Sequence, residues 1–179
     1  LYPDQCGIYS GNAMPEPEDF SIGGLNKITS ISVDGKETVY IATDGNGVHF
    51  LSHKKQQVTR RFYHDVSDKE GIRSNSVYSL LVDDRGAVWV GHFQAGLDYS
   101  LYQNGLFRTY AYPPLFNSAN LSIRSFISRG QEKVIGSRDG LFYINEATGM
   151  VKSFVKPVLT SDLILTISFY QGEYYIGTY

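Results

Sequence analysis

The sequence contains a single cysteine, Cys6, and this scarcity excludes two kinds of structure. One thiol cannot form a disulfide within the chain, and it cannot build a cysteine-ligated zinc site. Positive charge is also scarce, because 16 lysines and arginines stand against 18 acidic residues and give a formal net charge of −2. A protein with this charge has no basic field to attract nucleic acid or an anionic membrane surface. We therefore expect no nucleic acid among its partners.

Long apolar runs and helical patterns are missing as well. No stretch approaches the roughly 18–20 apolar residues of a membrane-spanning helix, and no signal-peptide pattern is present. No window of about 11 or more residues repeats apolar positions at helical spacing. The sequence begins at Leu1 rather than at methionine. We expect a segment of a longer protein that does not itself insert into a membrane.

Strand-forming residues, in contrast, are abundant. Aromatic residues make up 14% of the chain and include 14 tyrosines, which favours strands over helices. The stretch Ser74–Tyr110 alternates short apolar runs with turn sequences. Its expected strands are Val77–Val82, Val88–Gly91, Leu97–Tyr102 and Leu106–Tyr110, with a tight turn at Asp83–Gly86. This order predicts a four-stranded antiparallel meander.

The pattern of this stretch recurs along the chain. Its first strand aligns on Ile28, Val77, Ile123 and Ile164, and its second strand aligns on Ile41, Val90, Ile135 and Ile176. The two positions are 12 or 13 residues apart in every copy, and successive copies of the second position are 49, 45 and 41 residues apart. A repeat of roughly 40–50 residues with four strands is typical of a propeller blade. We therefore predict an all-β fold of four-stranded β-propeller blades.

The copies predict one propeller segment, residues 1–179, with about four blades' worth of strands. The predicted divisions are the outer strands of a preceding blade at 1–24, blades at 25–71, 72–120 and 121–162, and the inner strands of a further blade at 163–179. The two half-blades could combine and close a four-bladed ring. The alternative, which we favour, is a part of a larger, seven-bladed propeller, whose neighbouring blades would cover the sheet edges at both ends.

The middle copy resembles a known repeat. The sequences Ser74-Asn75-Ser76-Val77, Asp83 to Gly86, Val88-Trp89-Val90-Gly91 and Ala95-Gly96-Leu97 match the pattern of the two-component regulator propeller repeat. The run Tyr174–Thr178 matches its strand motif again, and Val39–Thr43 matches more loosely. The third copy departs most, because Val134 replaces the aromatic residue and Ser137 replaces threonine. Through the repeats, the resemblance covers nearly the whole chain.

This resemblance implies a function. Such repeats look like the periplasmic sensor region of hybrid two-component histidine kinases, typical of gut Bacteroidetes, which detect oligosaccharides. We expect a non-catalytic, periplasmic sensor module of an inner-membrane protein that forms a homodimer. The implied partners are an oligosaccharide and neighbouring propeller and sensor domains of the same protein, without a cofactor. Histidine kinase activity would belong to the parent protein.

One pair of residues breaks the repeat on the face where propellers usually admit a ligand. The loops after the second strands and the loops between blades share this face. His92 and Phe93 stand there where the other copies have Thr43/Asp44, Ser137/Arg138 and Thr178/Tyr179. A departure from a structural rule is where function is expected, and aromatic faces beside planar polar groups suit a sugar. We predict that His92 and Phe93 bind ligand, and the alternative is a surface loop that fills its own gap.

Further candidates for ligand contact on this face are Arg138, Arg73, Tyr112, His64 and Arg124. For Arg138 the competing interpretation is surface pairing with Asp139. The residues Tyr40, Trp89 and Tyr175 share one repeat position in the second strands, and we predict that they wedge between neighbouring blades. Asp83 and Gly86 are expected to form a turn, in which the aspartate accepts backbone hydrogen bonds.

Metal and enzyme chemistry find little support in the sequence. His49 and His53 have the spacing of a helical metal pair, but in extended chain they lie about 13 Å apart, so we expect no metal site. The run Ser32–Val39 approaches the Asp box of sialidases but lacks its tryptophan, and no catalytic elbow, zinc-protease or phosphate-loop motif occurs. Two alternative functions remain open: a scaffold that binds another protein on the same face, and a glycan-active propeller enzyme of the sialidase or lyase type.

Overall fold

The computed structural model of the chain describes residues 27–52, 54–55, 57–101, 106–110 and 121–179. Within these ranges every regular element is a β-strand, as the sequence predicts. The first sheet contains β1 (Ile28–Val33), β2 (Thr38–Thr43), β3 (Val48–Ser52) and β4 (Gln57–Phe62). The second contains β5 (Val77–Val82), β6 (Val88–His92), β7 (Leu97–Ser100) and β8 (Arg108–Thr109). The third contains β9 (Ile123–Arg129), β10 (Glu132–Ser137), β11 (Gly140–Asn145) and β12 (Met150–Phe154), and β13 (Ile164–Tyr170) pairs with β14 (Glu173–Thr178).

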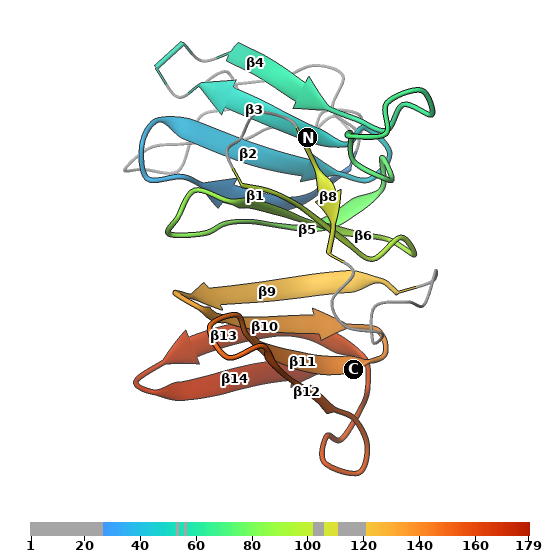
Figure 1. Cartoon of the computed structure of the whole chain (residues 1–179), viewed down its shortest axis with the longest axis vertical. Helices are drawn as coiled ribbons and strands as arrows, with labels where there is room; N and C mark the ends of the chain where they lie inside the picture. The colour runs from blue at the N-terminus through green and yellow to red at the C-terminus, as the bar shows by residue number, and fades with distance from the viewer. Residues whose placement is uncertain (1–26, 53, 56, 102–105, 111–120) are drawn as a thin grey trace, which may run out of the picture.

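The strands of each sheet lie in chain order and pair antiparallel, so every sheet is a meander. Figure 1 shows the sheets following one another from β1–β4 through β5–β8 and β9–β12 to β13–β14. The first strands are neighbours, since β5 packs between β1 and β9, and β9 packs between β5 and β13. Face-to-face sheets with adjacent first strands are the arrangement of propeller blades. The predicted fold class is confirmed, and the first-strand anchors Ile28, Val77, Ile123 and Ile164 each begin a strand.

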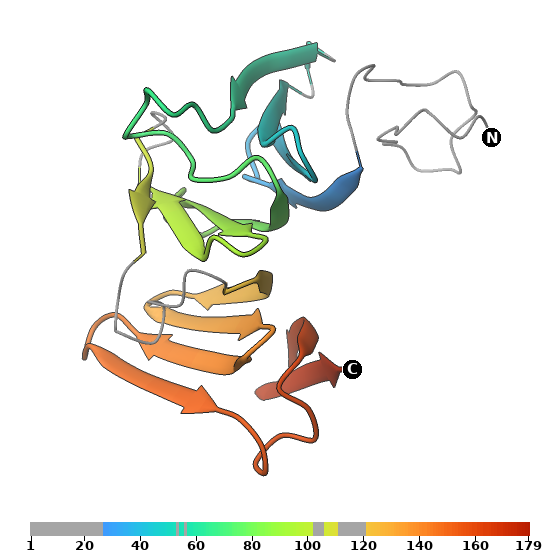
Figure 2. The ribbon, with the colours of Figure 1, turned by 90° about the vertical axis from the view of Figure 1, so that its right-hand side faces the viewer.

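The hydrophobic core lies between blades rather than within one central layer. One cluster joins the first two blades and contains Tyr40, Phe50, Val88 and Phe107 among its members. A second cluster joins the second and third blades, and a third joins the third blade to β13 and β14. Figure 2 shows the sheets β5–β8 and β9–β12 lying face to face. Each blade therefore buries both faces only when a blade stands on either side of it.

The repeated aromatic position behaves as predicted in two copies of three. Tyr40 and Trp89 are buried in the clusters between blades, at 0% and 1% exposure. Tyr175 is 52% exposed, and its wedging between blades stays a prediction. Tyr174 and Ile176 pack towards the third blade, so the alternation of strand side chains turns Tyr175 to the opposite face of β14. No described residue covers that face.

The small residue that follows the second anchor has a packing reason. A Cβ atom added at Gly91 would lie 2.8 Å from Ile123 Cγ2, and one added at Gly136 would lie 2.6 Å from Ile164 Cγ2. Both isoleucines begin the first strand of the next blade. Glycine at this position therefore allows the next blade to approach the second strand closely.

Asp83 organises the turn of the middle repeat. Its carboxylate accepts hydrogen bonds from the backbone N–H groups of Arg85 (3.0 Å) and Ala87 (2.9 Å), and from Trp89 Nε1 (3.1 Å). Burial raises the pKa of Asp83, but the hydrogen bonds from Trp89, Ala87 and Arg85 outweigh it and hold the pKa below its usual range. Asp34 stands six residues before Tyr40 and accepts from the Tyr40 hydroxyl in the same way (3.3 Å). In both blades, the hydrogen bond to the aspartate thus holds the buried aromatic side chain, Trp89 or Tyr40, against the turn before its strand.

Charged side chains extend this turn to the third blade. Arg85 contacts both Asp83 (3.2 Å) and Glu146 (2.8 Å). The buried ammonium of Lys133 donates to the Gly130 carbonyl (2.8 Å) and lies 3.5 Å from Glu146 and 3.9 Å from Asp83. The cluster thus crosses the boundary between the second and third blades with alternating charges.

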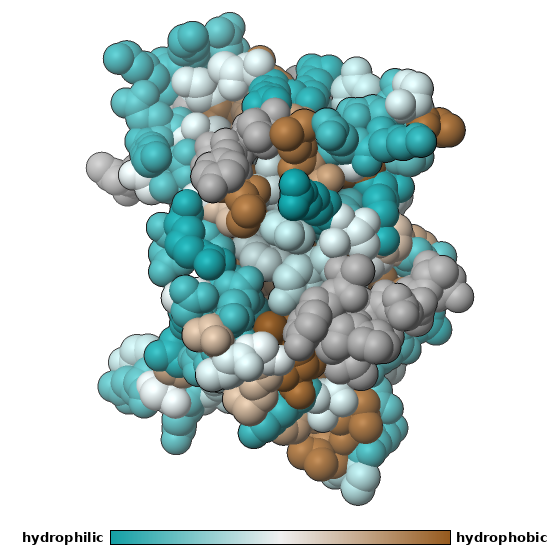
Figure 3. Space-filling view, viewed as in Figure 1, coloured by the Kyte–Doolittle hydropathy of each residue, from teal (hydrophilic) through white to brown (hydrophobic). Residues whose placement is uncertain are grey.

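The two ends of the described arc present apolar side chains to solvent. On β1, Ile31 and Val33 are 49% and 58% exposed. At the other end, a groove of about 410 Å³ opens between the third blade and β14, lined by residues such as Tyr143, Phe154 and Tyr174. Figure 3 shows apolar side chains gathered at the end of the molecule that contains β12 and β14. Successive first strands pack against each other, but β1 and β13, the first strands at the two ends of the described arc, do not pack in the same way. The strands expected in residues 1–24 lie outside the described residues.

In the described part of the chain, no helix is long and apolar enough to cross a bilayer.

Candidate ligand-binding face

The loops after the second strands meet the starts of the first strands at one end of the sheets. In each copy, one loop residue lies two positions after the small residue that follows the second-strand anchor. Its backbone N–H donates to the carbonyl of the residue just before a first strand. These bonds join Asp44 to Lys27 (2.8 Å), Phe93 to Ser76 (3.0 Å), Arg138 to Ser122 (3.1 Å) and Tyr179 to Leu163 (3.1 Å). Because the first strands surround the propeller axis, we call this end the axial face. It carries Thr29, Asp44, Tyr78, Phe93, Arg124, Arg138, Leu165 and Tyr179.

The centre of the axial face is a stacked aromatic pair. Phe93, in the β6–β7 loop, stacks on Tyr78, the second residue of β5, with ring centroids 4.9 Å apart and an interplanar angle of 29°. Both side chains are half-buried. The guanidinium carbon of Arg124, the second residue of β9, lies 5.6 Å from the Tyr78 ring centroid. We call this partly exposed stack, in which each ring covers one face of the other, the platform; the second blade provides both rings, and the third blade adds a cation beside Tyr78.

The loop that carries Phe93 is held firmly by the next blade. Gln94 N donates to Ser122 Oγ (3.2 Å), and Gly96 N donates to the Leu121 carbonyl (2.9 Å). The backbone of Gln94 has a positive φ of 53°, a conformation that residues other than glycine rarely adopt. Such backbone strain clusters at functional sites. The platform is therefore pre-organised before any ligand binds.

The expectation that His92 is exposed in a loop is wrong. His92 ends β6 and is 0% exposed. The equivalent residues Thr43 and Ser137 are also buried, and their hydroxyl groups donate to the carbonyls of Gly47 and Gly140 at 2.9 Å. His92 replaces that bond with one to Asp98 (Nε2 to Oδ2, 2.8 Å), in which Nε2 must carry the proton because a carboxylate only accepts. The histidine thus holds the loop that presents Phe93.

Arg73 belongs to the same network. Its Nε and its backbone N donate to Asp98 at 2.7 and 2.9 Å, and its terminal nitrogen donates to the Leu97 carbonyl (3.3 Å). Asp98 is 1% exposed, whereas the Arg73 side chain is 39% exposed. Asp98 therefore neutralises Arg73 and orients His92, and its role was not visible in the sequence. Contact of Arg73 or His92 with a ligand stays a prediction.

The other predicted residues fall into two groups. His64 is exposed and braces the β4–β5 loop, where its Nδ1 lies 3.0 Å from the Ile72 carbonyl and its backbone N donates to Asn75 Oδ1 (2.7 Å). Arg138 is exposed on the axial face and does not form the expected pair with Asp139. Tyr112 lies outside the described residues, as does His53. The structure therefore brings Phe93, Arg124 and Arg138 together on one face and places His64 in the loop that precedes it.

No metal centre is formed by the described residues, where no group of three or more histidine, cysteine, aspartate or glutamate side chains converges. His49 lies on β3 and is buried. Burial and the neighbouring Arg61 lower the pKa of His49.

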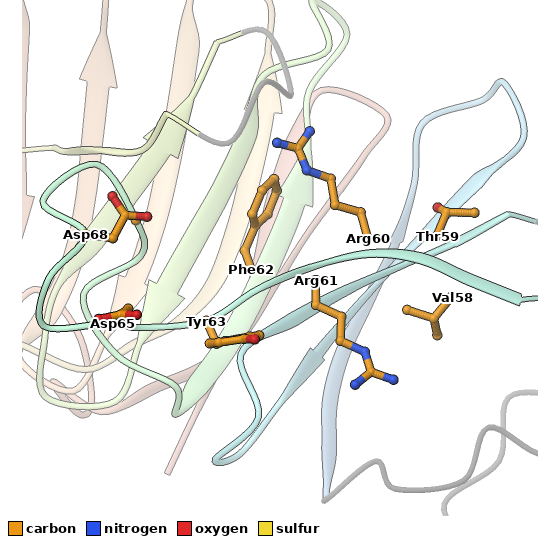
Figure 4. Close-up of a pocket in the computed structure, with 9 residues that line it drawn as sticks. Val58, Thr59, Arg60, Arg61, Phe62, Tyr63, Asp65 and Asp68 are labelled. Atoms are coloured by element: carbon orange, nitrogen blue, oxygen red, sulfur yellow. The ribbon is translucent and has the colours of Figure 1, made fainter.

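A cavity of about 590 Å³ lies at the outer strand of the first blade, β4, and the loop that follows it. Figure 4 shows Arg60 and Phe62 pointing to one side of β4, while Arg61 and Tyr63 point to the other. Asp65 and Asp68 belong to the following loop, and Asp65 accepts from Ser67 of that loop (2.8 and 2.6 Å). Polar groups that diverge in this way do not build a single binding site. We place the candidate site on the axial face.

Sequence reasoning missed Tyr78, although a signal for it exists. The residue after each first-strand anchor is Thr29, Tyr78, Arg124 or Leu165. This position changes in every copy, as does the loop position of Phe93. Both variable positions lie at the same end of the sheets. Comparing the repeats for variable positions, and not for regular ones alone, would have identified the face.

Comparison with known proteins supports the repeat and the fold. Residues 71–94 match the sequence model of the family described as "Two component regulator propeller". The resemblance to this repeat is confirmed, and the match covers the last part of the β4–β5 loop, β5, β6 and the first residues of the β6–β7 loop, including Phe93. No curated protein sequence matches the chain.

Solved structures share the fold. The chain is similar to the extracellular domain of the hybrid two component system BT3049 from B. thetaiotaomicron, with a TM-score of 0.71, 22% identity, and coverage of 87% of this chain and 20% of that one. It is similar to that of BT4673 from the same organism, with a TM-score of 0.61, 18% identity, and coverage of 85% and 26%. It also resembles the β-propeller domain of Myceliophteria thermophila Cps50 (Swd1), with a TM-score of 0.61, 16% identity, and coverage of 84% and 49%. The chain thus spans about a fifth to a quarter of the two extracellular domains.

Proposed function

We propose that this chain is part of a periplasmic, non-catalytic sensor of a hybrid two-component signalling protein, and that its axial face takes part in detecting an oligosaccharide. The observation that carries the proposal is the Tyr78–Phe93 platform with Arg124 at its edge. An aromatic face accommodates the C–H surface of a sugar ring, and planar polar groups at its rim bind the hydroxyl groups. The repeat at residues 71–94 and the fold shared with two extracellular sensor-system domains support the same interpretation.

In this proposal the signal is a change of conformational population rather than a chemical reaction. A ligand on the axial face contacts the second and third blades, which also share the cluster of Asp83, Arg85, Lys133 and Glu146. Binding would stabilise one arrangement of these blades against neighbouring propeller and sensor domains of the same protein. The parent protein would pass the change, as a homodimer in the inner membrane, to its histidine kinase.

Calorimetric titration of the chain with a panel of oligosaccharides tests the proposal. We expect at least one saccharide to bind, and we expect Phe93→Ala to weaken its affinity about tenfold, because about 1.4 kcal/mol of stacking corresponds to that factor. Phe169→Ala is the matched control. Phe169 also lies under an arginine, with Arg129 3.6 Å from its ring centroid, but at the opposite end of the sheets.

Two outcomes would contradict the proposal. Absence of binding across the panel, together with capture of a protein that Phe93→Ala no longer retains, would identify an interaction scaffold. Release of product from a tested glycan, detected by chromatography of the titrated mixture, would identify an enzyme.

A further inference from the structure

Two arginines of the axial face have no counter-charge. Arg124 and Arg138 form no ion pair with any described carboxylate. By contrast, Arg73, Arg85 and Arg129 each contact an acidic side chain. Of the three described arginines of the third blade, Arg124 and Arg138 therefore keep an uncompensated charge, and both lie on the axial face.

Arg124 also carries an unsatisfied donor. Its Nε is buried and has no hydrogen-bond partner. A buried donor without a partner costs about 1–3 kcal/mol, and more when the group is charged. Structures rarely retain such a cost unless a ligand, an ion or water satisfies the group. Because Nε is buried, a ligand would contact the terminal nitrogens of Arg124, whose N–H groups can bind a planar or tetrahedral anionic group through two parallel hydrogen bonds.

The acidic groups around the platform form no ion pair with Arg124 or Arg138. Asp98 is buried and already bonded to Arg73 and His92. Asp139, in the turn after β10, is exposed, and its backbone N donates to Ser137 Oγ (2.9 Å). Asp44 follows β2 of the first blade, and its backbone pairs with that of Ser76 in an isolated β-bridge. The side of the platform that faces the third blade is thus cationic.

We propose that the axial face selects an acidic saccharide, one whose sugar ring carries a carboxylate or a sulfate group. This inference rests on the proposed function, since it names the class of ligand for the same face. The sugar ring packs against the exposed part of the Tyr78–Phe93 stack, and its anionic substituent lies beside Arg124, whose guanidinium carbon is 5.6 Å from the Tyr78 ring centroid. Arg138, on the neighbouring loop, adds a second positive charge without a fixed partner.

The test compares saccharides that differ only in charge. The chain is titrated with oligogalacturonide and with its methyl-esterified counterpart, and in a second arm with a sulfated galactan oligosaccharide that has no uronic acid and with its desulfated, neutral form. We expect the acidic member of at least one pair to bind about tenfold more tightly, and the responding pair distinguishes carboxylate from sulfate. We also expect the affinity for the acidic member to fall as salt is raised from 50 to about 500 mM.

Arginine-to-glutamine variants test which residue binds the anionic group of the saccharide. Arg124→Gln is expected to lower the affinity for the acidic saccharide about tenfold and to leave that for the neutral partner within about threefold. Arg138→Gln, at an exposed position where folding is not at risk, is expected to lower the acidic affinity by about threefold. Arg108→Gln, an exposed arginine on β8 of the second blade, is the control and should change neither.

The outcomes separate this inference from the proposed function. Equal binding of the acidic and neutral members, or unchanged acidic affinity in both Arg124→Gln and Arg138→Gln, would overturn the inference while leaving a saccharide sensor. If no saccharide binds, charged or neutral, both the inference and the proposed function are wrong. A preference for the acidic member that disappears in Arg124→Gln and persists in Arg108→Gln would establish the inference.

Discussion

Replacing Trp89 with alanine is expected to lower the free energy of unfolding of the chain by about 3–5 kcal/mol. The indole is 1% exposed, packs against Tyr99 and Tyr110 at centroid distances of 5.2 Å each, and donates to Asp83. Its removal opens a cavity between the second and third blades and leaves Asp83 without one of its donors. Urea-induced unfolding, followed by circular dichroism, measures the loss.

Tyr175 provides the control for this prediction. It occupies the same repeat position as Trp89 but is 52% exposed, because no described residue packs on that face of β14. Tyr175→Ala should cost less than about 1 kcal/mol, as is usual for an exposed position. Equal losses for the two variants would mean that the repeat position stabilises its own sheet and not the boundary between blades.

Replacing Asp83 with alanine is expected to cost about 2–4 kcal/mol. The substitution leaves the Ala87 N–H and Trp89 Nε1 without an acceptor, and it removes the carboxylate that lies between Arg85 and Lys133. Asp84→Ala is the matched control, because Asp84 is the exposed neighbour in the same turn and should cost less than about 0.5 kcal/mol. Urea unfolding at pH 7 compares the three proteins, and similar losses in both variants would contradict the assigned role.

The stability that the Asp83 carboxylate contributes should decrease at low pH. Its pKa in the folded chain lies below the ordinary value of 3.8, so the carboxylate contributes stability above about pH 4. That contribution is lost as the pH falls through the lower pKa of the folded state. The difference in stability between the wild type and Asp83→Ala should therefore be constant from pH 7 to about pH 5 and shrink below about pH 4. A difference that grows on acidification would contradict the account.

The sequence predicted the repeating part of the fold because backbone pairing and interblade packing impose a spacing. First-strand anchors such as Val77 and Ile123 begin strands, and the small residue Gly91 lies where the next blade approaches. These requirements recur in each blade, so internal comparison of the copies was sufficient to identify them. The exposure of Tyr175 does not follow from its own repeat, since it depends on whether a further sheet packs on that face of β14.

The site was predicted only in part, for a physical reason. His92 and Phe93 both depart from the repeat, but they do so for different purposes: His92 turns inward to Asp98, whereas Phe93 stacks outward on Tyr78. Sequence spacing alone cannot distinguish a buried substitute for a threonine from an exposed platform. The partner Asp98 and the ring of Tyr78 become visible only when the β6–β7 loop and the start of β5 are placed together.

The central claim, that the axial face binds the ligand, is tested most directly by nuclear magnetic resonance of the chain during titration with the saccharide that binds most tightly. We expect the chemical-shift changes to be largest at Tyr78, Phe93, Arg124 and Arg138, and small on β4. Largest changes at the outer cavity of Val58–Tyr63, or in the groove around Tyr143 and Phe154, with an unchanged axial face, would contradict the account.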